Sequence, residues 1–226
     1  MQDGTGVKLT PDVAAVVAPV FEHSAGRAAS GCDVVVVPVF LSEEAALQVI
    51  REELETHGLR MDRKEIRDLE VTIPQRLMRY DEVEGKYVNA INESADTPPT
   101  PLVIDLGDSR RQVAVEFVSE EEYEELSGVH SYPILREYDF KEVAGYVSER
   151  VRAEGHGVFF GAFYDPAMNL DQFAIWAEHE RDRTKKGERY EADRMLQERK
   201  IRREAERLLR LQVRDFVDWL KAQGVI

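Results

Sequence analysis

The stretch VVVVPVFL, residues 34–41, decides the fold class of this chain. Neighbouring side chains of a β-strand point to opposite faces, so a strand that is apolar at every position is typical of a sheet covered on both faces. A second stretch of this kind, VFFGAFY, spans residues 158–164. We therefore predict two interior strands that lie between layers of helix.

Each of these stretches contains one residue that modifies the prediction. Pro38 has no backbone N–H to donate to a neighbouring strand, which favours a sheet edge or a bulge at that position. Gly161 lacks a side chain in the middle of a strand, which predicts that another part of the chain approaches its backbone closely.

The segments around the two strands predict alternating helices and strands. Capping residues and helical spacing of apolar residues predict helices between Ser42 and Gly58 and between Asp139 and Gly155. We also expect a short N-terminal helix after Pro11 and a short acidic helix over 120–126. The fold class is therefore α/β (or α+β), with a mixed β-sheet, packed helices and a long C-terminal helical arm.

A hairpin is predicted in the middle of the chain, with strands over 102–106 and 112–118. We expect Leu106 to lie opposite Arg111, because this register gathers the aliphatic side chains on one face. In this register Asp105 and Glu116 share the other face, about 13 Å apart at the usual rise of a strand.

The C-terminal segment from Asn169 onward is predicted to be helical. Near its end, apolar residues recur at steps of three or four, which indicates an amphipathic helix: Ala205, Leu209, Val213, Phe216 and Leu220. We divide the chain into a mixed α/β domain over 1–167 and a helical arm over 168–226, packed on the domain or on a partner. The arm carries interleaved charges of both signs, which suit contact with a protein partner or with a second copy.

The composition limits the function classes. Of 226 residues, 33% are charged, and the formal net charge is −14, so we do not expect nucleic acid to be a partner. The single cysteine, Cys32, allows no intrachain disulfide, and no apolar segment has the length of a membrane span. These features favour a cytoplasmic protein without a membrane partner.

Polar residues follow three predicted strands, at Ser42 and Glu43, at Ser119 and Glu120, and at Tyr164 and Asp165. If these strands run parallel in one sheet, their carboxyl ends share an edge, where α/β proteins bind ligands. We consider a ligand or metal edge formed by Glu43, Glu120, Tyr164 and Asp165, in which the carboxylates hold a divalent cation. The alternative is that these residues only cap helices.

Asp105 and Glu116 form an alternative acidic pair on the hairpin. An Asp followed by Glu-x-Lys on adjacent strands is the pattern of restriction-type nucleases. The position of the lysine is taken here by Val118, and the predicted register separates the two carboxylates too widely for a shared ion.

Two hypotheses of function follow from these patterns. The first is a non-catalytic interaction or regulatory protein that binds a protein partner, or itself as a homodimer, through the C-terminal arm. The second is a metal-dependent hydrolase whose acidic site lies at the carboxyl ends of the strands. No motif specifies a cofactor, and a divalent metal is the one that we consider.

Overall fold

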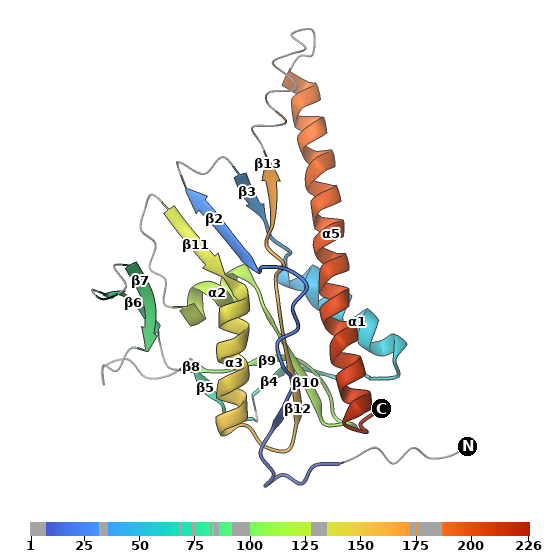
Figure 1. The fold of residues 1–226 in the computed structure, drawn as a ribbon. Coiled ribbons are helices and arrows are strands. Elements are labelled where there is room, and N and C mark those ends of the chain that lie inside the picture. The colour runs from blue at the N-terminus through green and yellow to red at the C-terminus, as the bar shows by residue number, and fades with distance from the viewer. Residues whose placement is uncertain are drawn as a thin grey trace.

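Strand β12 (Phe159–Tyr164), the second aliphatic stretch, belongs to the main sheet of a computed structural model of the chain (Figure 1). All six of its residues are buried. The structure describes residues 8–31, 36–67, 69–73, 76–81, 83, 86–91, 100–127, 135–171, 175 and 187–226.

The described elements begin with three strands, continue with a first helix, a run of seven strands and a second helix, and then alternate as far as β12. The helices are α1 (Glu43–Thr56), α2 (Glu120–Ser127), α3 (Phe140–Glu154) and α5 (Gly187–Ala222). The other strands are β1 (Val16–Val17), β2 (Arg27–Gly31), β3 (Val36–Val39), β4 (Arg63–Ile66), β5 (Thr72–Ile73), β6 (Arg76–Asp81), β7 (Lys86–Ile91), β8 (Thr100–Pro101), β9 (Ile104–Asp108), β10 (Val113–Val118), β11 (Leu135–Asp139) and β13 (Met168–Asp171).

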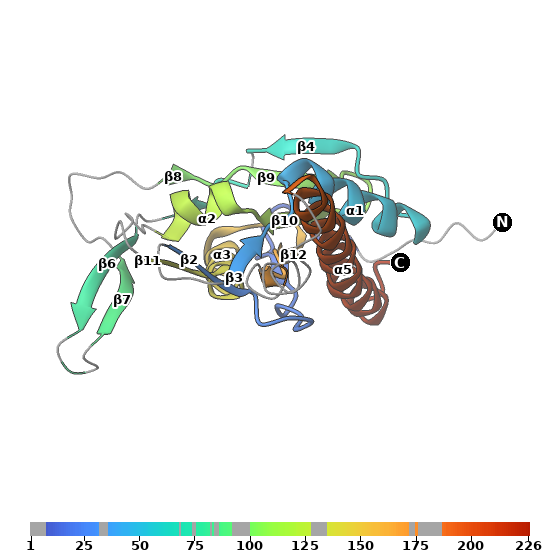
Figure 2. The ribbon, with the colours of Figure 1, turned by 90° about the horizontal axis from the view of Figure 1, so that it is seen from above.

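The main sheet has five strands in the order β1-β12-β10-β9-β4. β1 and β10 both run parallel to β12, whereas β9 runs antiparallel to β10 and β4 antiparallel to β9. The sheet is therefore mixed, as predicted. Four two-stranded ribbons accompany it, and the β6–β7 ribbon projects away from its edge (Figures 1 and 2).

Helices cover both faces of the main sheet. On one face, α3 packs Val143 and Val147 into a core that includes Phe160 and Tyr164 of β12. On the other face, α1 and α5 lie side by side, and their apolar residues share a core with Phe163 (Figure 2). The prediction of an interior strand over 158–164 is confirmed, because β12 lies between these two layers.

Caps fix the ends of the helices much as the sequence predicts. Ser42 accepts a hydrogen bond from the backbone N–H of Ala45 at the start of α1 (3.4 Å). Asp139 does the same for the N–H of Glu142 at the start of α3 (2.9 Å), and Gly155 caps its end. Such caps satisfy N–H groups that have no partner within the helix.

The predicted N-terminal helix after Pro11 is wrong, because this segment forms strand β1. The N–H of Val16 donates to Val158 O (2.9 Å) and the N–H of Ala18 to Phe160 O (2.8 Å). The run between Pro11 and Pro19 is too short for a stable helix, whereas the open edge of β12 offers backbone partners to an extended segment.

The first aliphatic stretch forms a strand outside the main sheet. β3 pairs with β13 in an antiparallel ribbon in which Pro38 lies opposite Asn169. Both strands of such a ribbon are edges, which suits a proline. The expected place inside the main sheet is therefore wrong. So is the helix expected from Asn169, since β13 occupies that segment; residues 34 and 35 lie outside the described part.

The C-terminal helix α5 covers the main sheet with the predicted apolar stripe. Its five members are all buried: Ala205, Leu209, Val213, Phe216 and Leu220. The Phe216 ring lies on the backbone of Gly161, where an added Cβ would be 2.7 Å from Phe216 Cε2, so the predicted close approach is confirmed. Although α5 is long, no described helix has an apolar stretch able to cross a lipid bilayer.

The division of the chain at residue 167 into an α/β domain and a helical arm stays a prediction.

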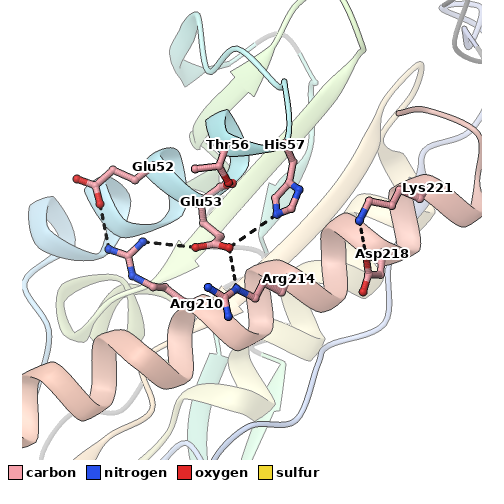
Figure 3. A network of polar contacts seen from close by, with 8 residues as sticks. All are labelled: Glu52, Glu53, Thr56, His57, Arg210, Arg214, Asp218 and Lys221. Carbon is pink, nitrogen blue, oxygen red and sulfur yellow. Dashed lines mark hydrogen bonds and ion pairs between the residues drawn. The ribbon is translucent and has the colours of Figure 1, made fainter.

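A polar network also joins α5 to α1 (Figure 3). Glu53 of α1 is buried and accepts a hydrogen bond from Arg214 Nε (2.7 Å), with Arg210 at 3.5 Å. Burial acts to raise the pKa of Glu53, but the hydrogen bonds and charges of Arg214 and Arg210 hold it below its ordinary value. Arg210 also contacts Glu52 (2.9 Å), so two adjacent carboxylates of α1 bind α5.

We expect Gly161→Ala to destabilise the protein, because the new methyl group would force the Phe216 ring out of its position. The expected loss in the free energy of unfolding is about 1–3 kcal/mol, measured by urea denaturation. Gly145→Ala in α3 is the matched control, since its Cβ would meet nothing within 4 Å. This control should be neutral or slightly stabilising. Equal stability of the two variants would contradict the close packing at Gly161.

Candidate functional site

The register of the β9–β10 hairpin brings the acidic pair together. Leu106 lies opposite Val115, and the two strands continue toward Asp105 and Glu116 as neighbours. The predicted register was wrong because the turn lies over residues 109–112, two positions beyond the expected 107–110. Asp108 accepts hydrogen bonds from the N–H groups of Arg111 (2.9 Å) and Arg60 (2.6 Å), which stabilises the turn at this position.

The two carboxylates replace backbone hydrogen bonds between β9 and β10. The N–H of Asp105 donates to Glu116 Oε2 (3.0 Å), and the N–H of Phe117 donates to Asp105 Oδ2 (2.7 Å). The alternation of β9 is interrupted here, since Ile104 packs in the α3 core and Leu106 in the α1–α5 core. Each carboxylate is thus fixed through one of its oxygen atoms.

A third carboxylate, Glu122, reaches the pair from α2. Ser119 and Glu122 form a reciprocal cap, in which Glu122 N–H donates to Ser119 Oγ (3.2 Å) and Ser119 N–H donates to Glu122 Oε2 (3.3 Å). One carboxylate oxygen from each of Asp105, Glu116 and Glu122 lies within 4.8 Å of the others, and we call these three residues the carboxylate cluster. Sequence analysis missed Glu122, although the Ser-x-x-Glu spacing could have placed it beside the end of β10.

Burial changes the protonation of the carboxylate cluster. The pKa of Asp105 is raised to about 8, mainly by burial and also by the charge of Glu122, and burial raises the pKa of Glu122 to about 7. Burial, followed by the charges of its two neighbours, also places the pKa of Glu116 well above its ordinary value. The cluster therefore holds protons at neutral pH unless a cation replaces them.

Glu116 is the most constrained member of the cluster. Its side chain is fully buried, and its Oε1 atom has no hydrogen-bond partner among the described residues. A proton on Glu116 would allow it to donate to Glu122. A bound cation would satisfy the same oxygen in another way, because buried charges in proteins are paired or coordinate metals.

The donor set fits a hard divalent cation. Mg²⁺ and Mn²⁺ prefer carboxylate oxygens, and the ligands of an octahedral Mg²⁺ lie about 3–4 Å apart. The oxygens of the cluster span at most 4.8 Å, so a small inward rotation of the side chains would suffice. Each carboxylate retains one oxygen that is not bound to a backbone amide.

A pocket of about 600 Å³ opens beside the cluster, between α1 and the β4–β9 edge. Asp105 lines the pocket and joins it to the carboxylate cluster. We call it the acidic pocket, and its walls carry acidic, basic and apolar side chains: Glu43, Glu44, Leu47, Gln48, Arg51, Glu52, Lys64, Glu65, Asp105 and Leu106. Glu65 has a positive φ of 48°, a strained conformation of the kind that occurs at binding sites.

Of the residues in the predicted ligand edge, Glu43 lies nearest to the carboxylate cluster. It lines the acidic pocket in the first turn of α1, and its charge raises the pKa of Asp105 and Glu122. Glu120, at the start of α2, accepts a hydrogen bond from Tyr138 Oη (3.2 Å) instead.

Tyr164 and Asp165, at the end of β12, form hydrogen bonds with backbone groups of other segments. Tyr164 is buried, and its hydroxyl donates to Ser24 O (3.0 Å). Asp165 accepts from the N–H of Leu41 and from the N–H of Ala167, each at 2.7 Å, so both of its oxygens bind backbone. The structure thus brings Asp105 and Glu116 close to Glu122, whereas Asp165 binds the loop after β3.

We expect the stability of the metal-free protein to fall as pH rises from 6 to 8. The folded cluster keeps protons that the unfolded chain, with ordinary carboxyl pKa values near 4, has already released, so higher pH favours unfolding. The melting temperature should drop by roughly 5 °C over this window. Glu116→Gln should make the drop smaller, and Glu121→Gln, an exposed change on α2, should not. A wild-type melting temperature that rises between pH 6 and 8 would contradict this.

Comparisons with known proteins give no independent guide to this site. The chain matches no protein-family model, no curated protein and no solved structure. The function must therefore be argued from the carboxylate cluster and the acidic pocket themselves.

Proposed function

We propose that this protein is a divalent-metal-dependent hydrolase, with Asp105, Glu116 and Glu122 as the metal ligands. The observation that carries the proposal is the fully buried Glu116, whose free oxygen lies within reach of two other carboxylates. A protein that needed only stability would not gain from a fully buried carboxyl group beside two partly buried ones, since an apolar side chain would fill the place of Glu116 at lower cost.

The side chains of such a site have different roles: they hold the cation or line the path of the substrate. Bound Mg²⁺ or Mn²⁺ supplies a Lewis acid and lowers the pKa of a water molecule. Asp105 and Glu116 are fixed by backbone N–H groups, so their free oxygens keep a constant position. Asp105 also lines the acidic pocket, which offers a substrate access to the cation from the side of α1.

The acidic pair matches part of the restriction-type nuclease pattern, Asp followed by Glu-x-Lys. The lysine position is filled by Val118, which is buried in the α3 core. A lysine is nevertheless present near the pair, because Lys64 of β4 lines the same pocket as Asp105. The net charge of −14 and the glutamates of the pocket favour a substrate other than nucleic acid.

The proposal predicts that Mn²⁺ binds at pH 8 and that Glu116→Gln weakens this binding by at least about tenfold, measured by isothermal titration calorimetry. Binding should tighten between pH 6 and 8, because the cation displaces protons from the cluster. Glu121→Gln, an exposed change on the same helix as Glu122, should bind as the wild type does.

Asp165→Asn separates the two sets of candidate ligands. Both oxygens of Asp165 bind backbone amides, so this variant should lose stability and keep its affinity for Mn²⁺. Wild-type protein that binds no Mn²⁺ at millimolar concentration would refute the proposed function. Loss of Mn²⁺ binding in Asp165→Asn, with full binding in Glu116→Gln, would instead place the metal at the predicted ligand edge that contains Asp165.

A second candidate function is self-association through α5. The helix exposes two large apolar side chains near its N-terminal end, Met195 (53% exposed) and Leu196 (51%). Charged residues of both signs surround them, so two copies of the helix could pair with opposite charges in contact. This arrangement would bury the apolar pair against a second copy of the chain.

Self-association predicts an apparent mass above 25.9 kDa that increases with protein concentration in light scattering after gel filtration. Replacing Met195 and Leu196 together by Glu should return the mass to that of the monomer, because the change adds charge to the apolar patch. Replacing Glu204 by Gln, a change at a half-exposed residue further along α5, is the control. A wild-type protein that stays monomeric at all concentrations would exclude this function.

A further inference from the structure

Two basic side chains in the acidic pocket lack the partners that most other basic residues of the structure have. Arg51 extends from α1 and Lys64 from β4, and both line the pocket together with Asp105. Arg51 Nε is buried and has no hydrogen-bond partner in the part of the chain that the structure describes. Within the described part of the chain, neither residue forms an ion pair.

Glu52, the acidic residue next to Arg51 in the sequence, forms its hydrogen bonds with other residues. Glu52 accepts hydrogen bonds from Arg210 of α5 (2.9 Å) and from Gln48 (3.0 Å), as Figure 3 shows for Arg210. The carboxylate of Glu52 is therefore bound in the polar network between α1 and α5, and side chains of adjacent helical residues do not face each other. A buried donor of this kind costs free energy unless a ligand satisfies it.

We infer that the acidic pocket binds the phosphoryl group of a small phosphate ester, with Arg51 and Lys64 as its ligands. This inference rests on the proposed function, since it names the substrate class of the same metal site. The guanidinium group of Arg51 presents a fork of donors that suits two oxygens of a tetrahedral anion. Lys64 adds a second positive charge, and the cation at Asp105 would add a third contact.

The other walls of the acidic pocket limit the size and charge of the ligand. Glu43, Glu44 and Glu65 add negative charge around the two basic residues. The inference places a single phosphoryl group between Arg51, Lys64 and the cation, whereas a polymer of phosphates would extend past these glutamates and be repelled. The pocket volume of about 600 Å³ accommodates a small molecule.

The reaction at such a site is balanced without a further co-reactant. The oxygen of a water molecule forms a new bond to phosphorus, and the bond from phosphorus to the ester oxygen breaks. One proton of the water ends on the departing oxygen, which leaves as an alcohol, and inorganic phosphate is the other product. No oxidant or reductant takes part.

The test measures the affinity for inorganic phosphate by calorimetry, at pH 8 with saturating Mg²⁺. Wild-type protein should bind phosphate, and Arg51→Met or Lys64→Met should each weaken this binding by about tenfold or more. Arg207→Met is the matched control, because Arg207 pairs only with Glu204 of its own helix among the contacts that the structure describes. Melting temperatures of all variants verify that they are folded.

Each outcome bears on a different claim. Equal phosphate affinity in wild type, Arg51→Met and Lys64→Met would overturn the phosphoryl site. Acetate that binds as tightly as phosphate would overturn the substrate class, and a single-stranded oligonucleotide that binds more tightly than phosphate would overturn the size limit. Mn²⁺ binding is measured separately on the same variants and should not change. A protein that binds Mn²⁺ but not phosphate retains the metal site and loses this inference.

Discussion

The parallel pairing of β10 with β12, buried under helices on both faces, is the constraint on which the rest of the structure depends. Every residue of both strands is buried, including Glu116 in the middle of β10. A strand in this position normally carries apolar side chains, because a buried carboxylate loses the hydration that stabilises its charge. Strand β10 therefore holds an ionisable group, Glu116, where the physical environment opposes its charge.

Three features of the chain offset this cost. The backbone N–H of Asp105 donates to one oxygen of Glu116, and the strand ladder is interrupted so that it can. The second oxygen of Glu116 is left beside Asp105 and Glu122, where a shared proton or a bound cation can neutralise it. Buried ionisable sites commonly reduce the stability of a protein. The third feature is the close packing of α5 over Gly161, which stabilises the core elsewhere.

Local patterns predicted the elements that depend on local chemistry. The Ser42 and Asp139 caps, the spacing of the α5 stripe and the two-faced stretch at β12 each follow from neighbouring residues. Long-range pairing did not follow from such patterns. The hairpin register depends on Asp108, whose carboxylate binds the N–H of Arg60, 48 positions earlier in the chain. That register alone decides whether Asp105 and Glu116 are about 13 Å apart or in contact.

The same long-range contacts connect the candidate site to the C-terminal helix. One wall of the acidic pocket is α1, and α1 is bound to α5 through Glu52 and Glu53 (Figure 3). Arg210 pairs with Glu52, which is itself one of the residues that line the pocket. One acidic group of the pocket is therefore neutralised by a helix that begins more than 130 residues later in the chain. The sequence of α5 suggested an arm for contact with a partner. In the structure, α5 also supports α1, which forms one wall of the proposed substrate site.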